Sequence, residues 1–309
     1  MKTRRTFIKQ IGLGTTLTAL SPLHAFSYDA KKTIKLTILH TNDMHSHIEA
    51  FSSGRNKGLG GMFQLSSLVK KIRQEEENIL LLDAGDIFQG TPYFNLFAGE
   101  LEFRLMSDIG YDAVTIGNHD FDNGIDGLAN QMKYANFPFI CSNYDFTNTI
   151  LKDKVIPYKI FNKGGIKIGI LGLGIELKGL VDPKLYGNTK YLDPVTVANK
   201  TANYLKNKMK CNLVICLSHL GYKYNSNKLS DEKIAIKTKN IDLIIGGHTH
   251  SFLNEPVILK NSEKKDVLIS QVGYGAIKLG KIDYIFNEKK SKNYKFNLSF
   301  RSDMLDVKV

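Results

Sequence analysis

Five short polar motifs, each placed where a hydrophobic run ends, constrain the fold of this chain more than any other feature. Apolar runs that alternate with polar loops are typical of α/β folds, in which functional loops gather at the ends of buried strands. Five of the eight histidines lie in these motifs, together with several carboxylates and an amide. The motifs are Asp43-Met44-His45, Gly85-Asp86, residues 117–122 (Gly-Asn-His-Asp-Phe-Asp), Ser218-His219 and Gly246-Gly247-His248-Thr249-His250.

The hydrophobic runs before the motifs have the composition of strands. Alternating, β-branched residues at 33–40 predict the first strand. Continuous apolar runs, which are typical of strands buried on both faces, occur at residues 79–82, 113–116, 213–217 and 241–245. The spacing of apolar side chains predicts helices from about residue 62, at 92–107, at 125–134 and at 194–209. Because the pattern after residue 250 is all-β and no linker interrupts the chain, we expect one α/β domain.

The composition favours a globular protein without a membrane span. The chain has 309 residues, 42% of them hydrophobic, and no internal run approaches the roughly 18 apolar residues of a spanning helix. The net charge is +12, but only six basic residues are Arg, the residue favoured for reading base edges. We therefore interpret the charge as solvated surface and expect no polymeric nucleic acid as partner. Three cysteines are too few for a disulfide framework, and we expect buried thiols at Cys141, Cys211 and Cys216.

The first 25 residues resemble a twin-arginine export signal. Arg4 and Arg5 precede Phe7, Ile8 and Lys9, and a mildly apolar stretch follows at residues 11–20. The stretch ends near Ala25, a small residue suited to cleavage. The alternative is an ordinary basic N-terminus. We expect residues 1–25 to be a signal peptide, and the protein to be periplasmic.

The side chains of the motifs are those that hold divalent metals. Carboxylates, imidazoles and an amide oxygen suit two adjacent ions such as zinc, manganese or iron. Taken singly, each motif is more often a turn, a cap or a structural histidine, but the agreement of five motifs indicates a metal site. Asp43 and His45 sit two residues apart, so an extended turn would point both to one side. Asp86 is the candidate bridge between the metals, and the remaining candidate ligands are Asn118, His219, His248 and His250.

Four polar residues near the motifs are expected to support the ligands rather than bind metal. His40 and His47 suit local hydrogen bonds that orient the ligands, and Asp83 and Asp120 suit the same structural role.

With these motifs in place, the chain resembles the calcineurin-like metallophosphoesterases, and more narrowly the catalytic domain of the 5′-nucleotidase family. The resemblance implies a four-layer α/β/β/α sandwich over residues 33–305, with two mixed sheets and two metals at their edge. It implies one metal on Asp43, His45, Asp86 and His250, and another on Asp86, Asn118, His219 and His248. It also implies that His119 and Asp122 form a catalytic dyad, and that Asn118 and His119 bind the substrate. A carboxylate beside His119 would favour its protonated form.

Two features depart from the family pattern. Asp120 stands where the family usually has Glu, a change that keeps the charge. The sequence ends at Val309, before the C-terminal domain that binds the nucleotide in full-length relatives, so we expect that domain to be absent. A separate chain that supplies it is a candidate partner.

The expected function is that of an exported metal-dependent phosphoric ester hydrolase. The leading candidate is a 5′-nucleotidase-like phosphomonoesterase for nucleotide catabolism, in which a metal-activated hydroxide attacks phosphorus and His119 protonates the leaving group. The alternatives are a phosphodiesterase for 2′,3′-cyclic nucleotides, a sulfur-ester hydrolase, and a binding subunit that needs a separate substrate-binding chain.

Overall fold

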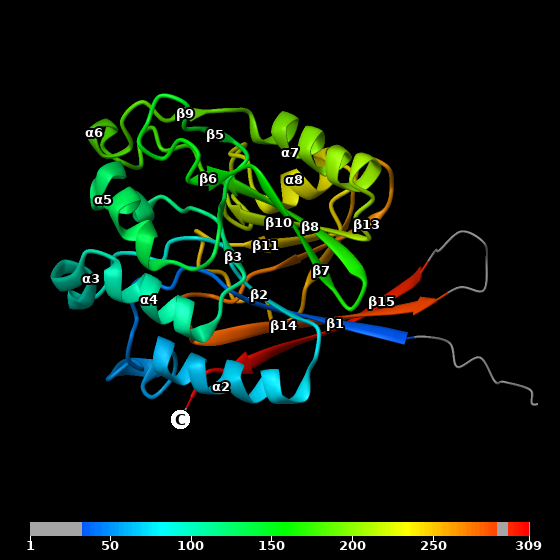
Figure 1. Ribbon diagram of the computed structural model, residues 1–309, viewed down its shortest axis with the longest axis horizontal. Helices are drawn as coiled ribbons and strands as arrows, with labels where there is room; N and C mark the ends of the chain where they lie inside the picture. Colours follow the sequence, from blue (N-terminus) through cyan, green and yellow to red (C-terminus); the bar gives the residue numbers. More distant parts are fainter. Residues whose placement is uncertain (1–32, 289–295, 309) are drawn as a thin grey trace, which may run out of the picture. The chain divides into compact units, whose positions relative to one another are not determined.

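Two β-sheets stacked face to face form the centre of the structure, and helices cover the outer face of each sheet (Figure 1). The computed structural model describes residues 33–288 and 296–308. The export signal expected at residues 1–25 lies outside these residues. From Thr33 onward the chain forms one compact unit. This arrangement confirms the expected four-layer α/β/β/α architecture.

The first sheet is mixed and has seven strands in the order β15-β14-β1-β2-β3-β4-β6. The neighbours from β1 to β6 are parallel, and β14 and β15 extend the sheet in antiparallel fashion. The strands are β1 (Thr33–Thr41), β2 (Ile79–Asp83), β3 (Ala113–Val114), β4 (Phe139–Ile140), β6 (Val155–Ile156), β14 (Lys278–Glu288) and β15 (Phe296–Asp306).

The second sheet is also mixed and has six strands in the order β12-β13-β11-β10-β8-β7. Its four central strands are parallel, whereas β12 and β7 pair in antiparallel fashion at the two edges. A separate two-stranded sheet joins β5 (Tyr144–Asp145) and β9 (Lys190–Tyr191). The six strands are β7 (Tyr158–Lys163), β8 (Ile166–Gly174), β10 (Leu213–His219), β11 (Leu243–Gly246), β12 (Val257–Lys260) and β13 (Asp266–Ser270).

Helices cover both outer faces. On the first sheet lie α2 (Met62–Glu75), α3 (Pro92–Phe97), α4 (Glu100–Ile109) and α5 (Gly124–Gln131), and on the second lie α7 (Pro194–Asn203) and α8 (Asp231–Lys237). The short elements are α6 (Pro183–Tyr186), the 3-10 turns η1 (Gly54–Asn56), η2 (His119–Phe121) and η3 (Met132–Tyr134), and the π-helix η4 (Tyr204–Lys208). Among the described residues, none of these helices combines the length and apolar character needed to cross a membrane.

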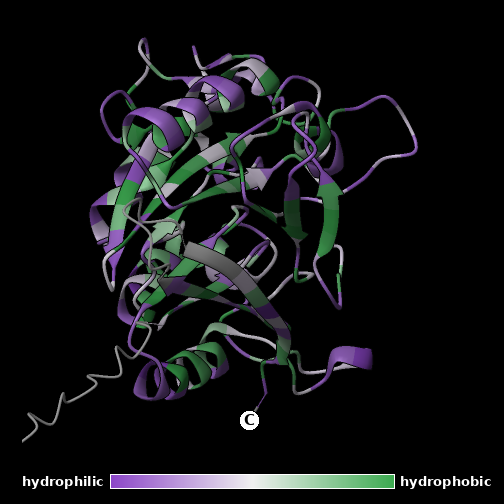
Figure 2. Cartoon of the chain, turned by 90° about the vertical axis from the view of Figure 1, so that its right-hand side faces the viewer, coloured by the Kyte–Doolittle hydropathy of each residue, from purple (hydrophilic) through white to green (hydrophobic). Residues whose placement is uncertain are grey.

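Three hydrophobic layers separate the four structural layers. Figure 2 shows the strands as mainly hydrophobic and the outer helices as mixed, which is typical of helices with one face on a sheet. The layer between the sheets is almost entirely aliphatic, with Ile38, Ile168 and Ile215 fully buried. The other two layers lie between each sheet and its helices. Cys141, Cys211 and Cys216 are buried free thiols in these outer layers, as expected.

The prediction of a single helix at residues 92–107 is wrong. The chain forms α3, breaks, and then forms α4. Ala98 and Gly99 both adopt left-handed backbone, with φ of 53° and 99°, which ends one helix and begins the next. The expectation failed because the spacing of apolar side chains continues across the break. The strand expected at residues 113–116 is limited to Ala113–Val114.

Candidate metal centre

The five polar motifs lie at the carboxyl ends of parallel strands in both sheets. Asp43 follows β1, Asp86 follows β2 and Asn118 follows β3 in the first sheet. His219 is the last residue of β10, and His248 follows β11 in the second. Since the parallel strands of a sheet end at one edge, the topology brings these side chains together.

Asp43, His45 and His250 form the first group of potential metal ligands. The three side chains each offer one ligand atom, and these atoms lie within 4.8 Å of one another. His250 Nε2 is 3.0 Å from His45 Nε2 and 3.3 Å from Asp43 Oδ1. Asp43 and His45 are buried, whereas the His250 side chain is 40% exposed at the rim. One imidazole-rich face of the site therefore opens toward solvent.

Asp86, His219 and His248 form the second group, again with ligand atoms within 4.8 Å of one another. His219 Nε2 is 3.0 Å from Asp86 Oδ2. Asn118, the expected amide ligand, joins this group because its Oδ1 lies 2.8 Å from His248 Nδ1. All seven expected ligands are thus assembled at one place.

Asp86 lies between the two groups. Its Oδ2 is 3.0 Å from His219 Nε2 of the second group and 4.0 Å from His45 Nε2 of the first. Its Oδ1 accepts a hydrogen bond of 2.8 Å from the backbone N–H of His119. Asp86 thus lies within 4.0 Å of a histidine of each group.

The orientations of the imidazoles fit a metal better than a hydrogen-bonded network. His219 Nε2 is fully buried and has no hydrogen-bond partner, although Asp86 Oδ2 is near. Its other nitrogen, Nδ1, donates to the carbonyl oxygen of Ala84 at 2.7 Å, which directs Nε2 into the site as a ligand. His45 and His250 likewise point their Nε2 atoms toward each other. With nitrogen and oxygen donors combined, the set suits zinc, manganese or iron.

The backbone of the ligand loops is left-handed at five positions where the side chain is not glycine. Asp43, His45, Asp86, His248 and His250 have φ between 48° and 71°. Such conformations cost free energy, and they cluster at functional sites where surrounding contacts hold them. The expected extended turn at residues 43–45 is therefore wrong. The two side chains meet because both residues are left-handed.

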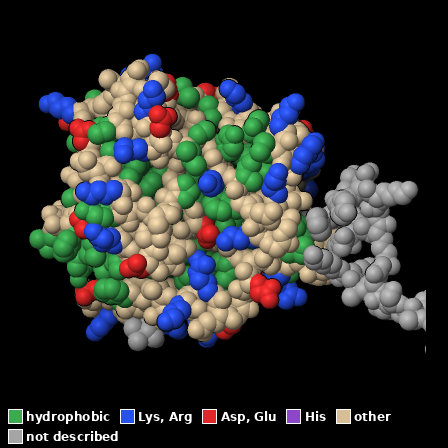
Figure 3. Space-filling view, viewed as in Figure 1, with side chains coloured by type: hydrophobic (Ala, Val, Ile, Leu, Met, Phe, Trp, Pro, Cys, Tyr) green, Lys and Arg blue, Asp and Glu red, His purple; other side chains and the backbone are tan. Residues whose placement is uncertain are grey.

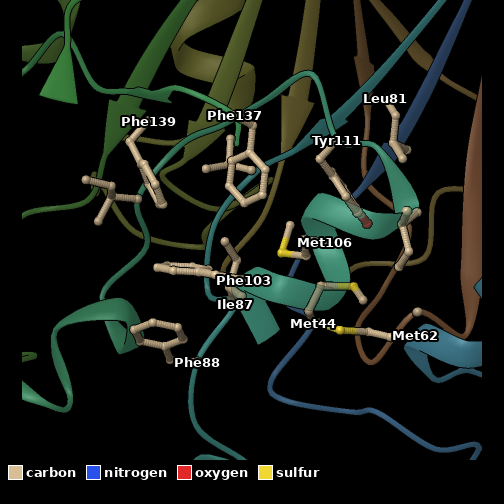
Figure 4. Close-up of a cluster of buried hydrophobic side chains, with 14 of the residues drawn as sticks. Met44, Met62, Leu81, Ile87, Phe88, Phe103, Met106, Tyr111, Phe137 and Phe139 are labelled. Carbon is tan, nitrogen blue, oxygen red and sulfur yellow. The ribbon is translucent and has the colours of Figure 1, made fainter. Parts of the chain in front are cut away.

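Buried apolar side chains next to the ligands anchor these loops in the core (Figure 4). Met44 lies between two ligands in sequence and is fully buried in the hydrophobic layer under α2 and α4. Ile87 and Phe88 directly follow Asp86 and are buried in the same layer. Phe88 packs against Phe103 with ring centroids 4.8 Å apart. This packing offsets part of the cost of the strained backbone.

Asp120 organises the loop that carries Asp86. Its carboxylate accepts hydrogen bonds from the backbone N–H groups of Gly117 (2.7 Å), Asp86 (3.1 Å), Ile87 (2.9 Å) and Phe88 (3.2 Å). Asp120 is 2% exposed and contributes to the geometry of the ligands without facing the metal groups.

Asp83 tightens the turn before Asp86. It accepts hydrogen bonds from the Thr41 hydroxyl at 2.6 Å and the Gly85 N–H at 2.8 Å. Gly85 has a φ of 88°, and a Cβ at this position would lie 2.6 Å from the Gly117 nitrogen. A glycine is therefore required where the two loops touch.

Two other buried or half-buried histidines, His40 and His47, have structural roles. His40 is buried and its Nε2 lies 3.0 Å from the Ser270 hydroxyl. His47 Nδ1 lies 3.0 Å from the carbonyl oxygen of His45, and its ring stacks on Phe51. Neither belongs to the two groups of ligands.

His119 stands beside the ligands and pairs with Asp122. His119 Nδ1 is 2.7 Å from Asp122 Oδ2, and this hydrogen bond raises the pKa of His119 above its ordinary value against the effect of burial. The ring lies edge-on to His45, with centroids 5.4 Å apart. The contact with Asp122 occupies Nδ1, so Nε2 is the ring nitrogen that remains for another partner.

The electrostatics of the site favour cations. Burial lowers the pKa of His248 to about 4, and the positive charges of His219 and Lys228 act in the same direction. Burial also lowers the pKa of His219, but the Asp86 and Asp43 carboxylates outweigh it and raise that pKa to about 10. The two buried carboxylates therefore stabilise positive charge at the place where the ligand atoms converge.

Two supporting residues were not expected from the sequence. Asn42 Nδ2 donates to Asp43 Oδ2 at 2.6 Å and to the Gly273 carbonyl oxygen at 2.6 Å. Gln271 Oε1 accepts from the Ser251 N–H at 2.5 Å, which holds the loop of His248 and His250. Asn42 directly precedes Asp43 of the first motif, and this position could have indicated its role. Gln271 directly follows β13, far from any motif, and nothing in the sequence indicated its role.

Comparison with known proteins agrees with this geometry. A family model described as calcineurin-like phosphoesterase matches residues 36–252. The snake venom 5′-nucleotidase of Gloydius brevicauda is 35% identical over 283 residues, which cover 84% of this chain and 47% of that protein. The crystal structure of the 5′-nucleotidase precursor from Thermus thermophilus is similar with a TM-score of 0.77 and 31% identity, covering 88% of this chain and 54% of its own.

A second similar structure matches over nearly its whole length. It is the calcineurin-like phosphoesterase YfkN from Bacillus subtilis, with a TM-score of 0.72, 25% identity, and coverage of 89% of this chain and 92% of that chain. The chain spans about half the length of the curated relatives it matches. The matched residues of the family model include all five motifs and both groups of ligands. The chain belongs to the calcineurin-like phosphoesterase family.

Proposed function

We propose that the protein is a two-metal hydrolase of phosphate monoesters, with nucleotides as its substrate class. The observation that supports this most strongly is the position of Asp86 between two groups of ligands, with His119 and Asp122 beside them. Several relatives carry the name 5′-nucleotidase, which supports a nucleotide as substrate.

The donor sets divide into two cation sites. Asp43, His45 and His250, with Asp86, would hold one divalent ion, and Asp86, His219 and His248, with Asn118, would hold the other. Zinc, manganese or iron fits this mixture of nitrogen and oxygen donors. When bound, such a pair supplies Lewis acidity that activates a water nucleophile and neutralises charge on the phosphoryl group.

The chain's own residues position the phosphoryl group and move one proton. Asn118 donates from its amide to a phosphoryl oxygen, and His119 approaches the leaving oxygen with Nε2. The attacking water first loses one proton. As its hydroxide oxygen forms a bond to phosphorus, the ester P–O bond breaks and the proton on His119 Nε2 passes to the departing alkoxide, so the proton released from the water balances the one that His119 must regain. Asp122 holds Nδ1 of the same ring at 2.7 Å, which fixes its orientation and stabilises the imidazolium before the transfer.

An assay of the metal-loaded full chain tests this function. Purified protein with Mn²⁺ or Zn²⁺ is assayed on AMP, on 2′,3′-cyclic AMP and on p-nitrophenyl phosphate, with His119→Ala as the matched variant. We expect phosphate release from AMP that the variant loses. Release only from the cyclic diester would reassign the substrate class. Activity on none of the three would favour a binding subunit that needs a separate substrate-binding chain.

We also propose that the protein is exported to the periplasm by the twin-arginine route. The proposal rests on Arg4 and Arg5 and the apolar stretch after them. Cell fractionation of the wild type and of the double variant Arg4→Lys with Arg5→Lys tests it. Periplasmic delivery that persists in the double variant would contradict the route.

A further inference from the structure

A second pocket lies on the outer side of the second sheet, between the edge strand β7 and helix α7 with its π-helical continuation η4. Its volume is about 660 Å³, within the range of sites that bind small molecules. None of its lining residues belongs to the metal centre, and the lining is predominantly apolar. Figure 3 shows this face of the molecule, where hydrophobic side chains are exposed among scattered Lys and Arg side chains.

Aromatic rings form one wall of the pocket. Tyr158 of β7 and Tyr204 of η4 face each other with ring centroids 5.4 Å apart and an angle of 48° between their planes. Leu192 lies beside them and is 40% exposed, and Tyr204 is 38% exposed. Two partly exposed tyrosine rings and an exposed leucine in a concave surface offer a binding surface for a planar apolar body.

The two lysines that line the pocket form no ion pair with the side chains that the structure describes. Lys200 and Lys208 line it and are exposed, and neither forms an ion pair with a carboxylate among residues 33–288 and 296–308. Lys206, which lies between them in sequence, is paired with Asp242 at 2.8 Å. Lys206 is therefore neutralised, whereas the charges of Lys200 and Lys208 at the pocket are left for an external anion.

The helix itself is irregular where it lines the pocket. The α-helical pattern of α7 ends at Asn203, and Tyr204–Lys208 is π-helical. π-helical turns are rare and frequently accompany functional sites. Here the turn carries both Tyr204 and Lys208, so the ring and the cation lie on one side of the helix.

We propose that this pocket binds a planar aromatic anion, at a site separate from the metal centre. The tyrosine rings and Leu192 contact the aromatic body, and the ammonium groups of Lys200 and Lys208 bind the anionic group. An aryl carboxylate and a nucleotide share this chemistry.

Binding of 2-naphthoate to the full chain tests the proposal. The chain contains no tryptophan, so the fluorescence anisotropy of the naphthyl group is measured without interference from that residue. We expect saturable binding, and weaker binding of the neutral analogue 2-naphthylmethanol. Lys200→Met with Lys208→Met, and separately Tyr204→Ala, should each weaken binding about 3- to 10-fold, given roughly 0.5–1.5 kcal/mol for a ring contact or a pair of exposed charges. Lys152→Met, an exposed lysine elsewhere, should leave binding unchanged.

A competition experiment distinguishes a nucleotide from another aryl anion as the ligand of the pocket. Displacement of naphthoate by AMP from chelator-treated protein identifies a nucleotide as the ligand, and the absence of displacement identifies a non-nucleotide aryl anion.

Tyr204→Leu replaces Tyr204→Ala if the latter does not fold. Absence of saturable binding would overturn the proposal, as would binding that none of the pocket variants changes. Self-association that Tyr204→Ala abolishes would show instead that a second copy covers this face. Because the readout is binding, its failure is distinct from failure of the proposed hydrolysis.

Discussion

The loops at the strand ends and the layer between the two sheets are built in opposite ways. Between the sheets, aliphatic side chains such as Ile168, Ile215 and Leu243 are fully buried on regular parallel strands. At the strand ends, the buried groups are carboxylates and imidazoles, and the backbone that carries them is left-handed at five ligand positions. The layer between the sheets supplies stability through apolar burial. The loops supply geometry at a cost in stability.

This difference teaches that folding and metal binding can be perturbed separately. The loops depend on the apolar layer under Met44 and Phe88 for their support, but the layer between the sheets contains none of the ligands. Substitutions at the ligands should therefore change metal content and activity more than stability. Substitutions between the sheets should do the reverse.

The largest effect is expected for Asp86→Ala. Removing the carboxylate that both groups of ligands share should abolish binding of both metals and, with it, activity. Metal content per chain, measured by inductively coupled plasma mass spectrometry, checks this. Asp266→Ala is the matched control, since its side chain is 56% exposed in a surface ion pair on β13. Retention of both metals by Asp86→Ala would contradict the claim that both groups of ligands share this carboxylate.

His119→Ala should separate catalysis from metal binding. Because His119 faces the site without belonging to either group of ligands, the variant should keep its metals and lose about 10²–10⁴-fold in kcat, the usual contribution of a general acid. Steady-state kinetics and metal analysis on the same preparation provide the measurement. Asp122→Asn, which keeps the ring but weakens its orientation, should lose less. Loss of metal in His119→Ala would show that this residue is a ligand.

Ile215→Ala tests the other side of the comparison. Removing a fully buried aliphatic side chain between the sheets should lower the free energy of unfolding by about 2–5 kcal/mol. Urea denaturation measures the loss, and the folded variant should keep its metal content. Ile258→Ala, at a position 51% exposed on the edge strand β12, should change stability by less than about 0.5 kcal/mol. A large loss of metal in folded Ile215→Ala would show that the two regions are coupled.

The smallest effect is expected for Asp120→Ala, which removes a buried support of the ligand loops. Four backbone N–H groups of the Asp86 and Asn118 loops would lose their acceptor, so metal affinity should fall roughly 10- to 100-fold. Titration with a competing chelator measures the affinity. Asp120→Glu keeps the carboxylate and should retain more of it. Equal affinity in the wild type and Asp120→Ala would mean that the packing of Ile87 and Phe88 alone holds the loop.

The sequence predicted the positions of the buried strands, and the candidate ligand residues lie together at their ends, for a physical reason. Continuous apolar runs identify strands buried on both faces, and polar motifs directly after them must then meet at one edge. The backbone conformation of the ligand loops and the supporting residues outside the motifs could not be predicted in the same way. The left-handed conformations of Asp43 and His45 depend on contacts with distant loops. Gln271 supports the His250 loop from 20 residues away along the chain.

Two further features show where local patterns fail. The apolar spacing across residues 92–107 continues through the break at Ala98 and Gly99, since both helices face the same sheet. The pocket between β7 and η4 joins residues from four separate segments. Its aromatic and cationic side chains look like ordinary surface residues until the fold brings them together.

The most direct test of the account is anomalous scattering from crystals of the metal-loaded protein. The account predicts two peaks about 3.5–4 Å apart, the usual separation in two-metal sites, with Asp86 oxygens bound to both. A single peak, or two peaks of which only one contacts Asp86, would contradict it.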